Sequence, residues 1–464
     1  MTASGQLAVF AYDLKMDHVP EAAIERAKDA FLDSIGVALA AGDYAFATKA
    51  ASAAEALSGG GEFPVIGSRV RLSLRESALL NGILIHGLDF DDTHLKSAIH
   101  PSASLVPTIL AVAYRQGSCG SSLLEAYIAG LEAMARLGQY GGMRLRDKGF
   151  HPTSVIGVFG CALAAGKLLE LDPEQLAMAQ GIALSMASGS VGSAADGASN
   201  KRLHAGWAAQ AGITAAMLAQ SGIRGPDRPY DGKRGLFRHI GAAEDEIAEG
   251  LAAELGSLGT VWETANISAK PIPACHFTHA CSDAAVRLRA GVGFEIADIR
   301  HITALVPAGV VQAVCEPLDL KRKPADAYAA QFSIPFVVAA SLVRGRFGLA
   351  ELDAAALTDP QILKLAGRVD YAIDPDSTYP VHRTGEIRIE LADGSIVRHR
   401  EAVNRGAPDR PLSRAEIASK FQDNALRGAS PHRVAGIADA VRDMELALDG
   451  RGLVGRLCGN VCIA

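Results

Sequence analysis

The feature that most constrains this chain is a series of Ala-, Leu- and Val-rich segments in which apolar residues recur with helical periodicity on almost every face. A surface helix keeps one polar face, whereas a helix that is apolar all round has to be surrounded by other helices. The chain up to about residue 265 is therefore expected to form a large helical bundle with several central helices. These segments span residues 20–42, 75–90, 122–138, 153–170, 172–190 and 200–222.

The pattern changes after Ile267, where β-branched residues become more frequent and apolar residues partly alternate. Residues 297–311 and 385–403 show this alternation, and the Ala-Asp-Gly sequence at 392–394 is typical of a hairpin turn. A helical segment at 324–345 lies between them. This part of the chain is therefore expected to be a small α+β domain.

Helical periodicity returns from about Pro411, so the two ends of the chain are expected to belong to one domain. At 464 residues the sequence is long enough for two domains. It predicts a mainly α fold in which residues 1–266 plus 405–464 form a large all-helical domain. Residues 267–404 are expected to form a smaller, inserted α+β lid domain.

Composition and charge exclude several classes of function. Lys and Arg number 45 against 51 Asp and Glu, and the resulting net charge of −6 argues against a nucleic-acid partner. The seven cysteines are scattered without paired CxxC motifs, which is typical of reduced thiols in a cytosolic protein. The N-terminus shows no targeting pattern, and the apolar runs are too short to span a bilayer. A cytoplasmic protein with no membrane partner is expected.

Ionisable residues are unusually dense at residues 86–102, HGLDFDDTHLKSAIHPS. The preceding helix is expected to continue through Phe90, so His86 and Asp89, three residues apart, share a buried face, where charges have to be paired. One interpretation is a hydrogen-bonded core network in which Asp89 caps the helix end. A magnesium site is a second interpretation, but it requires carboxylates one helical turn apart, and the residue four after Asp91 is Leu95.

Two further motifs place cationic or titratable residues at the starts of apolar helices. GFHPTSVIG puts His151 directly before one helix, and SNKRLHAGW puts Lys201 and His204 in the first turn of another, with Ser199 or Asn200 as N-cap. The helix dipole disfavours positive charge there, so stability alone does not explain these residues. Such a position keeps a histidine neutral and suited to act as a base, and it attracts carboxylates. The alternative is that Lys201 extends into solvent and His151 only terminates a loop.

A fourth motif, AKPIPACHFTHA, lies at the predicted junction of the two domains. It contains Lys270, Cys275, His276 and His279, and its prolines favour an extended approach. Because clefts form at domain junctions, these residues are expected to complete a pocket for a polyanion. Zinc is the competing interpretation, but the recognised spacing of a fourth ligand is missing.

These four motifs, in this order, resemble the MmgE/PrpD family, and the resemblance covers nearly the whole chain. It implies a helical domain built from both chain ends, an inserted lid domain and a homodimer. It also implies chemistry on small di- and tricarboxylates without a cofactor or a metal. Reactions in this family include those of 2-methylcitrate dehydratase, cis-aconitate decarboxylase and iminodisuccinate epimerase.

The resemblance also implies roles for individual residues. Catalytic roles are expected for His100, His151, Lys201 and Lys270. Substrate-binding roles are expected for Asp89, Thr93, His204, Cys275 and His276. The sequence departs from the family pattern at Ala205, where many members have Pro, and at His276, where many have Arg. The form DFDDTH also differs from the DFNDTW of the methylcitrate dehydratase branch.

The shared chemistry of this family is a carbanion or enolate next to a carboxylate, which requires a base, an acid and fixed positive charge. The leading prediction is a cofactor-independent hydro-lyase similar to 2-methylcitrate dehydratase. Alternatives within the family are a decarboxylase similar to the cis-aconitate enzyme and an epimerase similar to the iminodisuccinate enzyme. Two other hypotheses are a metal-dependent helical enzyme, suggested by the aspartate run, and a non-catalytic binding or dimerisation scaffold, suggested by Ala205 and His276.

Overall fold

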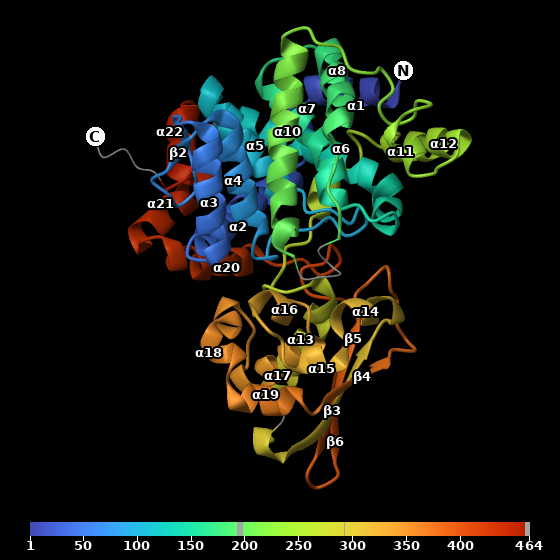
Figure 1. Cartoon of the computed structure of the whole chain (residues 1–464), viewed down its shortest axis with the longest axis vertical. Coiled ribbons are helices and arrows are strands. Elements are labelled where there is room, and N and C mark those ends of the chain that lie inside the picture. The colour runs from blue at the N-terminus through green and yellow to red at the C-terminus, as the bar shows by residue number, and fades with distance from the viewer. Residues whose placement is uncertain (193–197, 292, 460–464) are drawn as a thin grey trace. The chain divides into compact units, whose positions relative to one another are not determined.

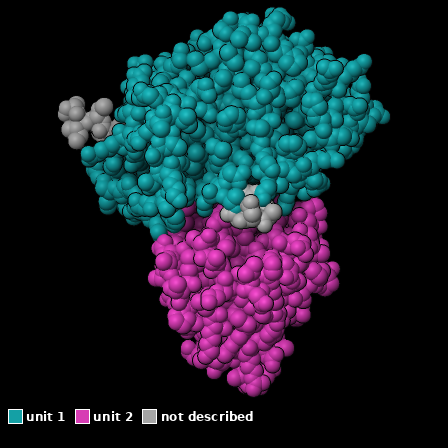
Figure 2. Space-filling model, in the orientation of Figure 1, with its two compact units in different colours: residues 1–87, 91–268, 413–464 teal, residues 88–90, 269–412 magenta. Residues whose placement is uncertain are grey.

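The computed structural model describes residues 1–192, 198–291 and 293–459 (Figure 1). The described chain is mainly helical with two small sheets, which confirms the predicted predominance of helix. It divides into two compact units, shown in different colours in Figure 2. Unit 1 comprises Met1–Gly87, Asp91–Ser268 and Ser413–Ala464, and unit 2 comprises Leu88–Phe90 and Ala269–Leu412.

Unit 1 contains most of the helices but is not wholly helical, because a short antiparallel pair, β1 (Phe63–Pro64) and β2 (Arg71–Leu72), precedes α4. Its N-terminal helices are α1 (Ala3–Asp13), α2 (Glu21–Ala41), α3 (Ala45–Ser58), α4 (Leu74–His86), α5 (Ser102–Gln116), α6 (Gly120–Asp147), α7 (Pro152–Leu168) and α8 (Pro173–Ala183). The remaining helices are α10 (Leu203–Gln220), α11 (Leu236–His239), α12 (Glu244–Leu255), α20 (Arg414–Gly428), α21 (Pro431–Arg442) and α22 (Gly450–Leu457).

Helix α7 is the central helix of unit 1, as its apolar composition predicts. It packs against α6, α5, α8 and α10, and every residue in it except Lys167 is buried. The ammonium of Lys167 donates hydrogen bonds to the carbonyls of Ala11 and Leu14, so its donors have partners at the edge of the core. The burial of a whole helix explains why its sequence lacks a polar face.

Two glycines allow α4 and α10 to cross at close range. A Cβ on Gly82 would lie 2.4 Å from the Cα of Gly206, and a Cβ on Gly206 would lie 2.1 Å from the carbonyl oxygen of Leu79. Any larger side chain at either glycine would force the helices apart. The crossing therefore fixes the spacing between His86, which ends α4, and His204, which lies in the first turn of α10.

Unit 2 is built on a four-stranded sheet with the order β4–β3–β5–β6. The central strand β3 (Ile299–Val306) is parallel to β4 (Val369–Ile373) and antiparallel to β5 (Gly385–Leu391). Strand β6 (Ile396–Glu401) returns antiparallel to β5 through the predicted turn, where Gly394 has a φ of +85°. The sequence predicted β3 and the β5–β6 hairpin but not β4, because the alternation in β4 extends over only five residues.

Helices α13 and α17 pack against each other, α13 lies on β5 and β6, and α17 contacts β4. The predicted helix at 324–345 is divided in two, because the hydroxyl of Ser333 accepts a hydrogen bond from the backbone N–H of Phe336 and starts a new helix. The helices of unit 2 are α13 (His276–Gly291), α14 (Val311–Val314), α15 (Leu318–Arg322), α16 (Ala327–Gln331), α17 (Ile334–Arg344), α18 (Ala354–Leu357) and α19 (Pro360–Ala366).

Within the described residues, no single helix has the length and apolar character needed to cross a bilayer. The bent pair α2 and α3 meets that test by length and composition only. The described cysteines are all free thiols, and Cys462 lies outside the described residues.

Candidate active site

The motif at residues 86–102 follows α4 as a loop rather than as a continuation of the helix. Gly87 is the C-cap of α4, and Asp89 and Ala98 have φ values of +50° and +54°. The prediction that His86 and Asp89 share a helical face is therefore wrong. Left-handed backbone at residues other than glycine costs about 1–3 kcal/mol and is concentrated at functional sites.

Four histidine rings of unit 1 lie close together. The ring centroids of His86 and His100 are 4.7 Å apart, and those of His86 and His151 are 5.7 Å apart. His100 and His151 are 6.2 Å apart, and His151 is 5.0 Å from His204. This histidine cluster joins the end of α4, the following loop and the starts of α7 and α10. It brings together His100, His151 and His204 from three of the predicted motifs.

Asp91 provides a negative charge within the histidine cluster. Its Oδ2 lies 2.8 Å from Nδ1 of His86 and 3.2 Å from Nδ1 of His100, and the side chain is fully buried. Burial by itself would raise the pKa of Asp91, but the facing His86 and His100 imidazoles hold it well below its usual range. Asp91 is therefore ionised at neutral pH.

His151 and His204 form a hydrogen-bonded pair, with their Nδ1 atoms 2.9 Å apart. Burial lowers the pKa of His151 well below its usual value, and His86 and Lys201 lower it further. Burial, together with His86 and Lys201, lowers the pKa of His204 to about 4. Both imidazoles are neutral at pH 7, so one Nδ1 carries the shared proton and the other accepts it.

The sequence predicted that Lys201 lies in the first turn of α10. It lies instead in the short 3-10 helix η3 (Ser199–Arg202), which precedes α10. Neither Ser199 nor Asn200 is the N-cap of α10, because Arg202 takes that position. The positive charge of Lys201 is close enough to lower the pKa of both His151 and His204. A lysine beside neutral imidazoles provides the fixed positive charge and the proton acceptor that carboxylate chemistry requires.

The rest of the loop is held by hydrogen bonds from its backbone and side chains. The carboxylate of Asp92 accepts a hydrogen bond from the backbone N–H of Ser102, which starts α5, and another from its hydroxyl. The backbone N–H of His100 donates to Oγ1 of Thr153, at 3.0 Å, in the first turn of α7. Thr93 is buried and exchanges two backbone hydrogen bonds with Ser268.

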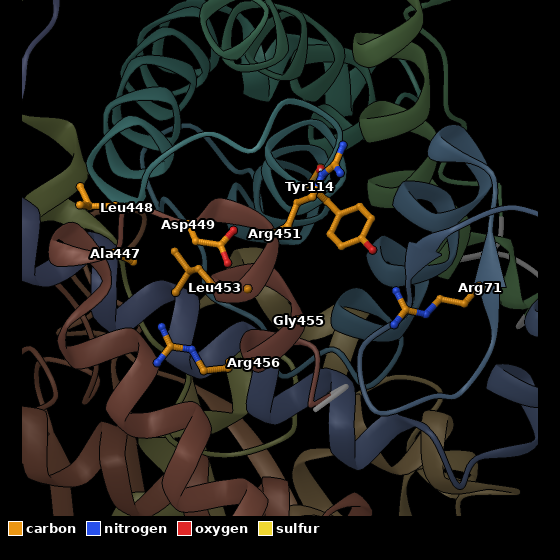
Figure 3. Close-up of a pocket in the computed structure, with 10 residues that line it drawn as sticks. Arg71, Tyr114, Ala447, Leu448, Asp449, Arg451, Leu453, Gly455 and Arg456 are labelled. Atoms are coloured by element: carbon orange, nitrogen blue, oxygen red, sulfur yellow. The ribbon is translucent and has the colours of Figure 1, made fainter. Parts of the chain in front are cut away.

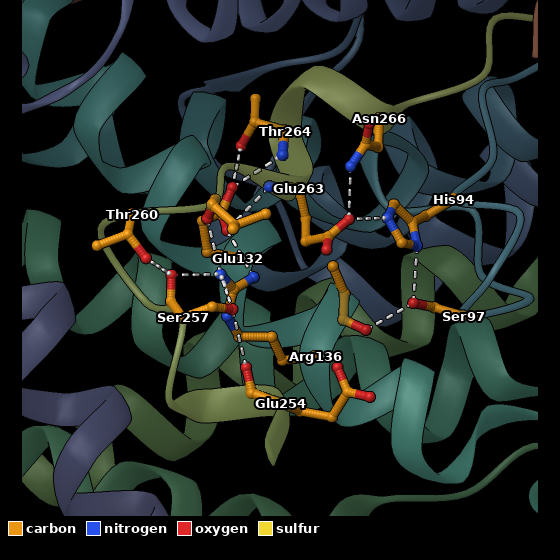
Figure 4. A network of polar contacts seen from close by, with 12 residues as sticks. His94, Ser97, Glu132, Arg136, Glu254, Ser257, Thr260, Glu263, Thr264 and Asn266 are labelled. Carbon is orange, nitrogen blue, oxygen red and sulfur yellow. Dashed lines mark hydrogen bonds and ion pairs between the residues drawn. The ribbon is translucent and has the colours of Figure 1, made fainter. Parts of the chain in front are cut away.

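Further support for the loop comes from a buried network in α6 (Figure 4). Nε2 of His94 lies 2.9 Å from Oε2 of Glu263, and the backbone N–H of Glu263 donates to Glu132. Glu132 also binds Arg136 at 2.8 Å and accepts hydrogen bonds from the N–H and hydroxyl of Thr264. Every carboxylate oxygen of Glu132 thus has a donor. The network anchors the loop through His94.

The other predicted residues lie in unit 2. Nζ of Lys270 is 3.1 Å from Oδ1 of Asp89 and donates to the Asp89 carbonyl at 2.6 Å, with both side chains buried. Cys275 precedes α13, and its backbone N–H donates to the carbonyl of Gln331. His276 is buried and stacks on His279, whose Nε2 donates to the carbonyl of Ala274. Lys270, one of the predicted catalytic residues, is therefore paired with the carboxylate of Asp89 in the same unit.

Sequence reasoning did not assign roles to His86 and Asp91, although both lie in the first motif. Gly87 was the available signal, because a glycine after the last periodic residue predicts that the helix ends there. Asp89, Asp91 and Asp92 each have a different partner, so the aspartate run does not form one carboxylate cluster.

His86, Asp91 and His100 have ligand atoms within 4.8 Å of one another, a separation that also suits a metal ion. The same distances are ordinary for hydrogen bonds. The donor set therefore fits either interpretation, and chelation distinguishes them experimentally.

A separate surface pocket lies beside α22 (Figure 3). Arg71, Arg451 and Arg456 line it together with Asp449 and Tyr114. None of its lining residues belongs to the histidine cluster. The guanidinium of Arg451 already donates to the carbonyl of Tyr114, so this pocket has no evident part in the chemistry of the cluster.

The described chain is thus a mainly helical protein with a largely buried cluster of four histidines and an aspartate. The MmgE/PrpD N-terminal domain matches residues 5–247, and the MmgE/PrpD C-terminal domain matches residues 272–446. The chain belongs to the MmgE/PrpD family.

Several characterised proteins resemble the chain over nearly its full length. The cis-aconitate decarboxylase of Homo sapiens is 29% identical over 451 residues, which cover 94% of this chain and 91% of the human protein. The Mus musculus cis-aconitate decarboxylase is 30% identical, with 94% and 89% of the two chains covered. The Aspergillus terreus cis-aconitate decarboxylase is 27% identical, with 96% and 94% covered.

Proposed function

We propose that the protein is an enzyme of the lyase type that acts, without a cofactor, on a small di- or tricarboxylate through a carbanion or enolate next to a carboxylate. The observation that carries this proposal is the convergence of His100, neutral His151 and Lys201 in unit 1. His100 is the most accessible of the four histidines, with 13% of its side chain exposed. An accessible imidazole beside a neutral one and a fixed cation is suited to move a proton at carbon.

Decarboxylation is the preferred reaction, because the relatives described above are cis-aconitate decarboxylases. The bond between carbon and the departing carboxylate breaks, carbon dioxide leaves, and the electron pair remains on carbon. A neighbouring unsaturated carboxylate delocalises that pair, and Lys201 stabilises the charge. A proton from a histidine then forms the new C–H bond, and solvent later restores the proton to the histidine. His100 is the candidate for this donor, because the lowered pKa of His151 keeps that imidazole neutral.

Dehydration, which the sequence favoured first, uses the same groups in another order. One histidine removes a proton next to a carboxylate, and a second group protonates the hydroxyl that leaves as water. Epimerisation needs only removal and return of the proton on opposite faces. The names of the relatives favour decarboxylation among these three, and 2-methylcitrate dehydration is the second candidate.

The test is a substrate panel followed by proton NMR. Purified enzyme is incubated with cis-aconitate, 2-methylcitrate, citrate or iminodisuccinate, and each product is identified from its spectrum. We expect turnover of cis-aconitate with loss of carbon dioxide, and we expect His100→Gln and His151→Ala to lose it by ~10²–10⁴-fold. Full activity of both variants would remove the histidine cluster from the mechanism.

Chelation tests the metal-dependent alternative. Enzyme dialysed exhaustively against EDTA is expected to keep its full activity, because the proposed chemistry requires only histidines and a lysine. Loss of activity that a divalent cation restores would favour a metal held by His86, Asp91 and His100. A protein that neither turns over nor binds any member of the panel would instead favour the non-catalytic scaffold.

The proposal extends to substrate-binding roles for Asp89, Thr93, His204, Cys275 and His276 and a catalytic role for Lys270. It also includes the lid function of unit 2, a cytoplasmic location consistent with the free thiols, and a homodimer.

The family resemblance is the basis of the homodimer proposal. Sedimentation velocity at micromolar concentration is expected to give the mass of two chains, and a monomer would contradict it.

A further inference from the structure

We propose that Asp91 is a positioning residue that fixes the tautomer of His100, so that Nδ1–H faces the carboxylate and Nε2 faces the reacting carbon. This inference rests on the proposed function, in which His100 transfers a proton. Asp91 itself does not touch the substrate. It acts through its contact with Nδ1 of His100.

The contact between one carboxylate oxygen and two imidazoles determines which nitrogens carry protons. An ionised carboxylate only accepts hydrogen bonds, and Oδ2 of Asp91 lies 2.8 Å from Nδ1 of His86 and 3.2 Å from Nδ1 of His100. The contact of His86 is a hydrogen bond and that of His100 is an ion pair, and a carboxylate beside both Nδ1 atoms favours Nδ1–H in each imidazole. In a neutral imidazole the other nitrogen, Nε2, then carries a lone pair.

His86 and His100 differ in accessibility, which separates their roles. Only 1% of the His86 side chain is exposed, against 13% for His100. Nε2 of His86 is buried with no hydrogen-bond partner among the described residues. His86 is therefore suited to hold Asp91 in place, whereas His100 is the histidine of the pair that a substrate can reach.

The surroundings prevent His100 and Asp91 from moving apart. The backbone N–H of His100 is bound to Oγ1 of Thr153, and Asp91 is fully buried beside the end of α4. When Nε2 of His100 takes up a proton, the resulting imidazolium lies next to the Asp91 carboxylate, which stabilises the charge. An aspartate that orients and stabilises a histidine in this way has the same role as the aspartate of a catalytic triad.

The kinetic test uses Asp91→Asn with Asp92→Asn as a matched control. The asparagine amide can donate to Nδ1 of His100, which places the imidazole proton on Nε2 instead. We expect kcat to fall by ~10²–10⁴-fold with KM changed by less than about threefold, since a wrong tautomer affects proton transfer more than binding. Asp92→Asn alters an equally buried aspartate that contacts Ser102 and no histidine, and it should keep kcat within about threefold.

A spectroscopic test does not depend on activity. In protein labelled with ¹⁵N-histidine, His100, assigned by comparison with His100→Gln, is expected to show the Nδ1–H tautomer in the parent. It should show the Nε2–H tautomer in Asp91→Asn. An unchanged tautomer overturns the inference even if the enzyme is inactive on every substrate tested.

Two other outcomes would also overturn the proposal. One is an equal loss of kcat in Asp91→Asn and Asp92→Asn with equal loss of thermal stability, which would mean that Asp91 supports only the fold. The other is a stoichiometric metal in the parent that disappears in Asp91→Asn, which would make Asp91 a ligand. Normal kcat in Asp91→Asn alongside an inactive His100→Gln would reject the inference while leaving the proposed function intact.

Discussion

Neutral histidines beside a lysine distinguish this cluster from an ordinary buried hydrogen-bond network. His151 and His204 stay uncharged because burial and the charge of Lys201 both oppose protonation. Asp91 carries a negative charge next to His86 and His100. The cluster therefore combines uncharged imidazoles at one end with a buried carboxylate at the other.

Lys201→Ala tests the electrostatic role at the residue scale. If Lys201 holds a carboxylate in both the ground state and the transition state, its loss should raise KM and lower kcat, with kcat/KM reduced by ~10²–10⁴-fold. The pKa of His204 should also rise from about 4, because one cause of its depression is removed. Steady-state kinetics and a histidine NMR titration measure these two effects.

Lys49→Ala is the control for that prediction, since Lys49 is an exposed lysine of α3 in the same unit. It should leave kcat/KM and the His204 titration unchanged. Equal kinetics for Lys201→Ala and the parent enzyme would remove Lys201 from the proposed site.

Several residue types could be predicted from sequence, but their pairing could not. The four motifs located His100, His151, Lys201 and His204, which the structure brings together. The sequence placed His86 and Asp89 on one helical face, which is wrong because α4 ends at His86, and the structure pairs His86 with Asp91. A difference of a few residues in a helix boundary thus changed which carboxylate joins the cluster.

At the scale of elements, the loop after α4 is held between α5, α6 and α7. Asp92 accepts a hydrogen bond from the first residue of α5, His100 binds the start of α7, and His94 connects to the Glu132 network of α6. Sequence periodicity predicted α6 and α7, because an apolar helix is a local pattern, but it did not predict α5. It could not predict the Glu132 network, because Arg136 is one turn away in the same helix whereas Thr264 lies on another segment that meets α6 only in the folded unit.

Glu132→Gln should destabilise unit 1 strongly. Glu132 and Arg136 are both fully buried, so the substitution leaves a buried guanidinium without its counter-charge. Breaking one side of a buried pair costs about 3–5 kcal/mol. Thermal unfolding followed by circular dichroism should show a clearly lower midpoint, accompanied by loss of the loop structure anchored through His94.

Glu174→Gln provides the matched control. Glu174 pairs with Arg224, but their side chains are 71% and 68% exposed. An exposed pair contributes about 0–1 kcal/mol, so this variant should unfold close to the parent. A midpoint for Glu132→Gln that equals that of Glu174→Gln would show that the α6 network contributes little to stability.

At the scale of the whole molecule, the change from helical periodicity to alternation predicted that a second unit begins near residue 266. The chain enters unit 2 at Ala269 and returns to unit 1 at Ser413, whereas the sequence placed the return at 405. The loop before α20 carries no periodic signal, so sequence alone could not locate this boundary. Leu88–Phe90 also belong to unit 2, although they follow α4 directly. Asp89 therefore belongs to unit 2 and Asp91 to unit 1, and no local sequence pattern predicts this division.

Buried histidines in both units should make stability depend on pH. Burial lowers the pKa of His204 to about 4 and that of His279 to about 3, and it lowers the pKa of His151 further below its usual value. Unfolded histidines titrate near 6.5, so on acidification the unfolded chain takes up protons first and the folded state loses stability. This loss begins as the pH falls below about 6.5 and continues towards 4.

Buried carboxyl groups oppose this trend, and variants separate the contributions. Burial raises the pKa of Asp92 to about 7 and that of Asp29 to about 6, and it also raises the pKa of Glu132 and Asp283, so their protonation stabilises the folded state as the pH falls. We expect the histidines to have the larger effect, so the unfolding midpoint should decrease between pH 7 and pH 5. His204→Gln should flatten this slope and Asp92→Asn should steepen it, as measured by thermal unfolding across that range. A midpoint that rises on acidification, or slopes that do not respond to either variant, would show that these groups do not control the pH dependence.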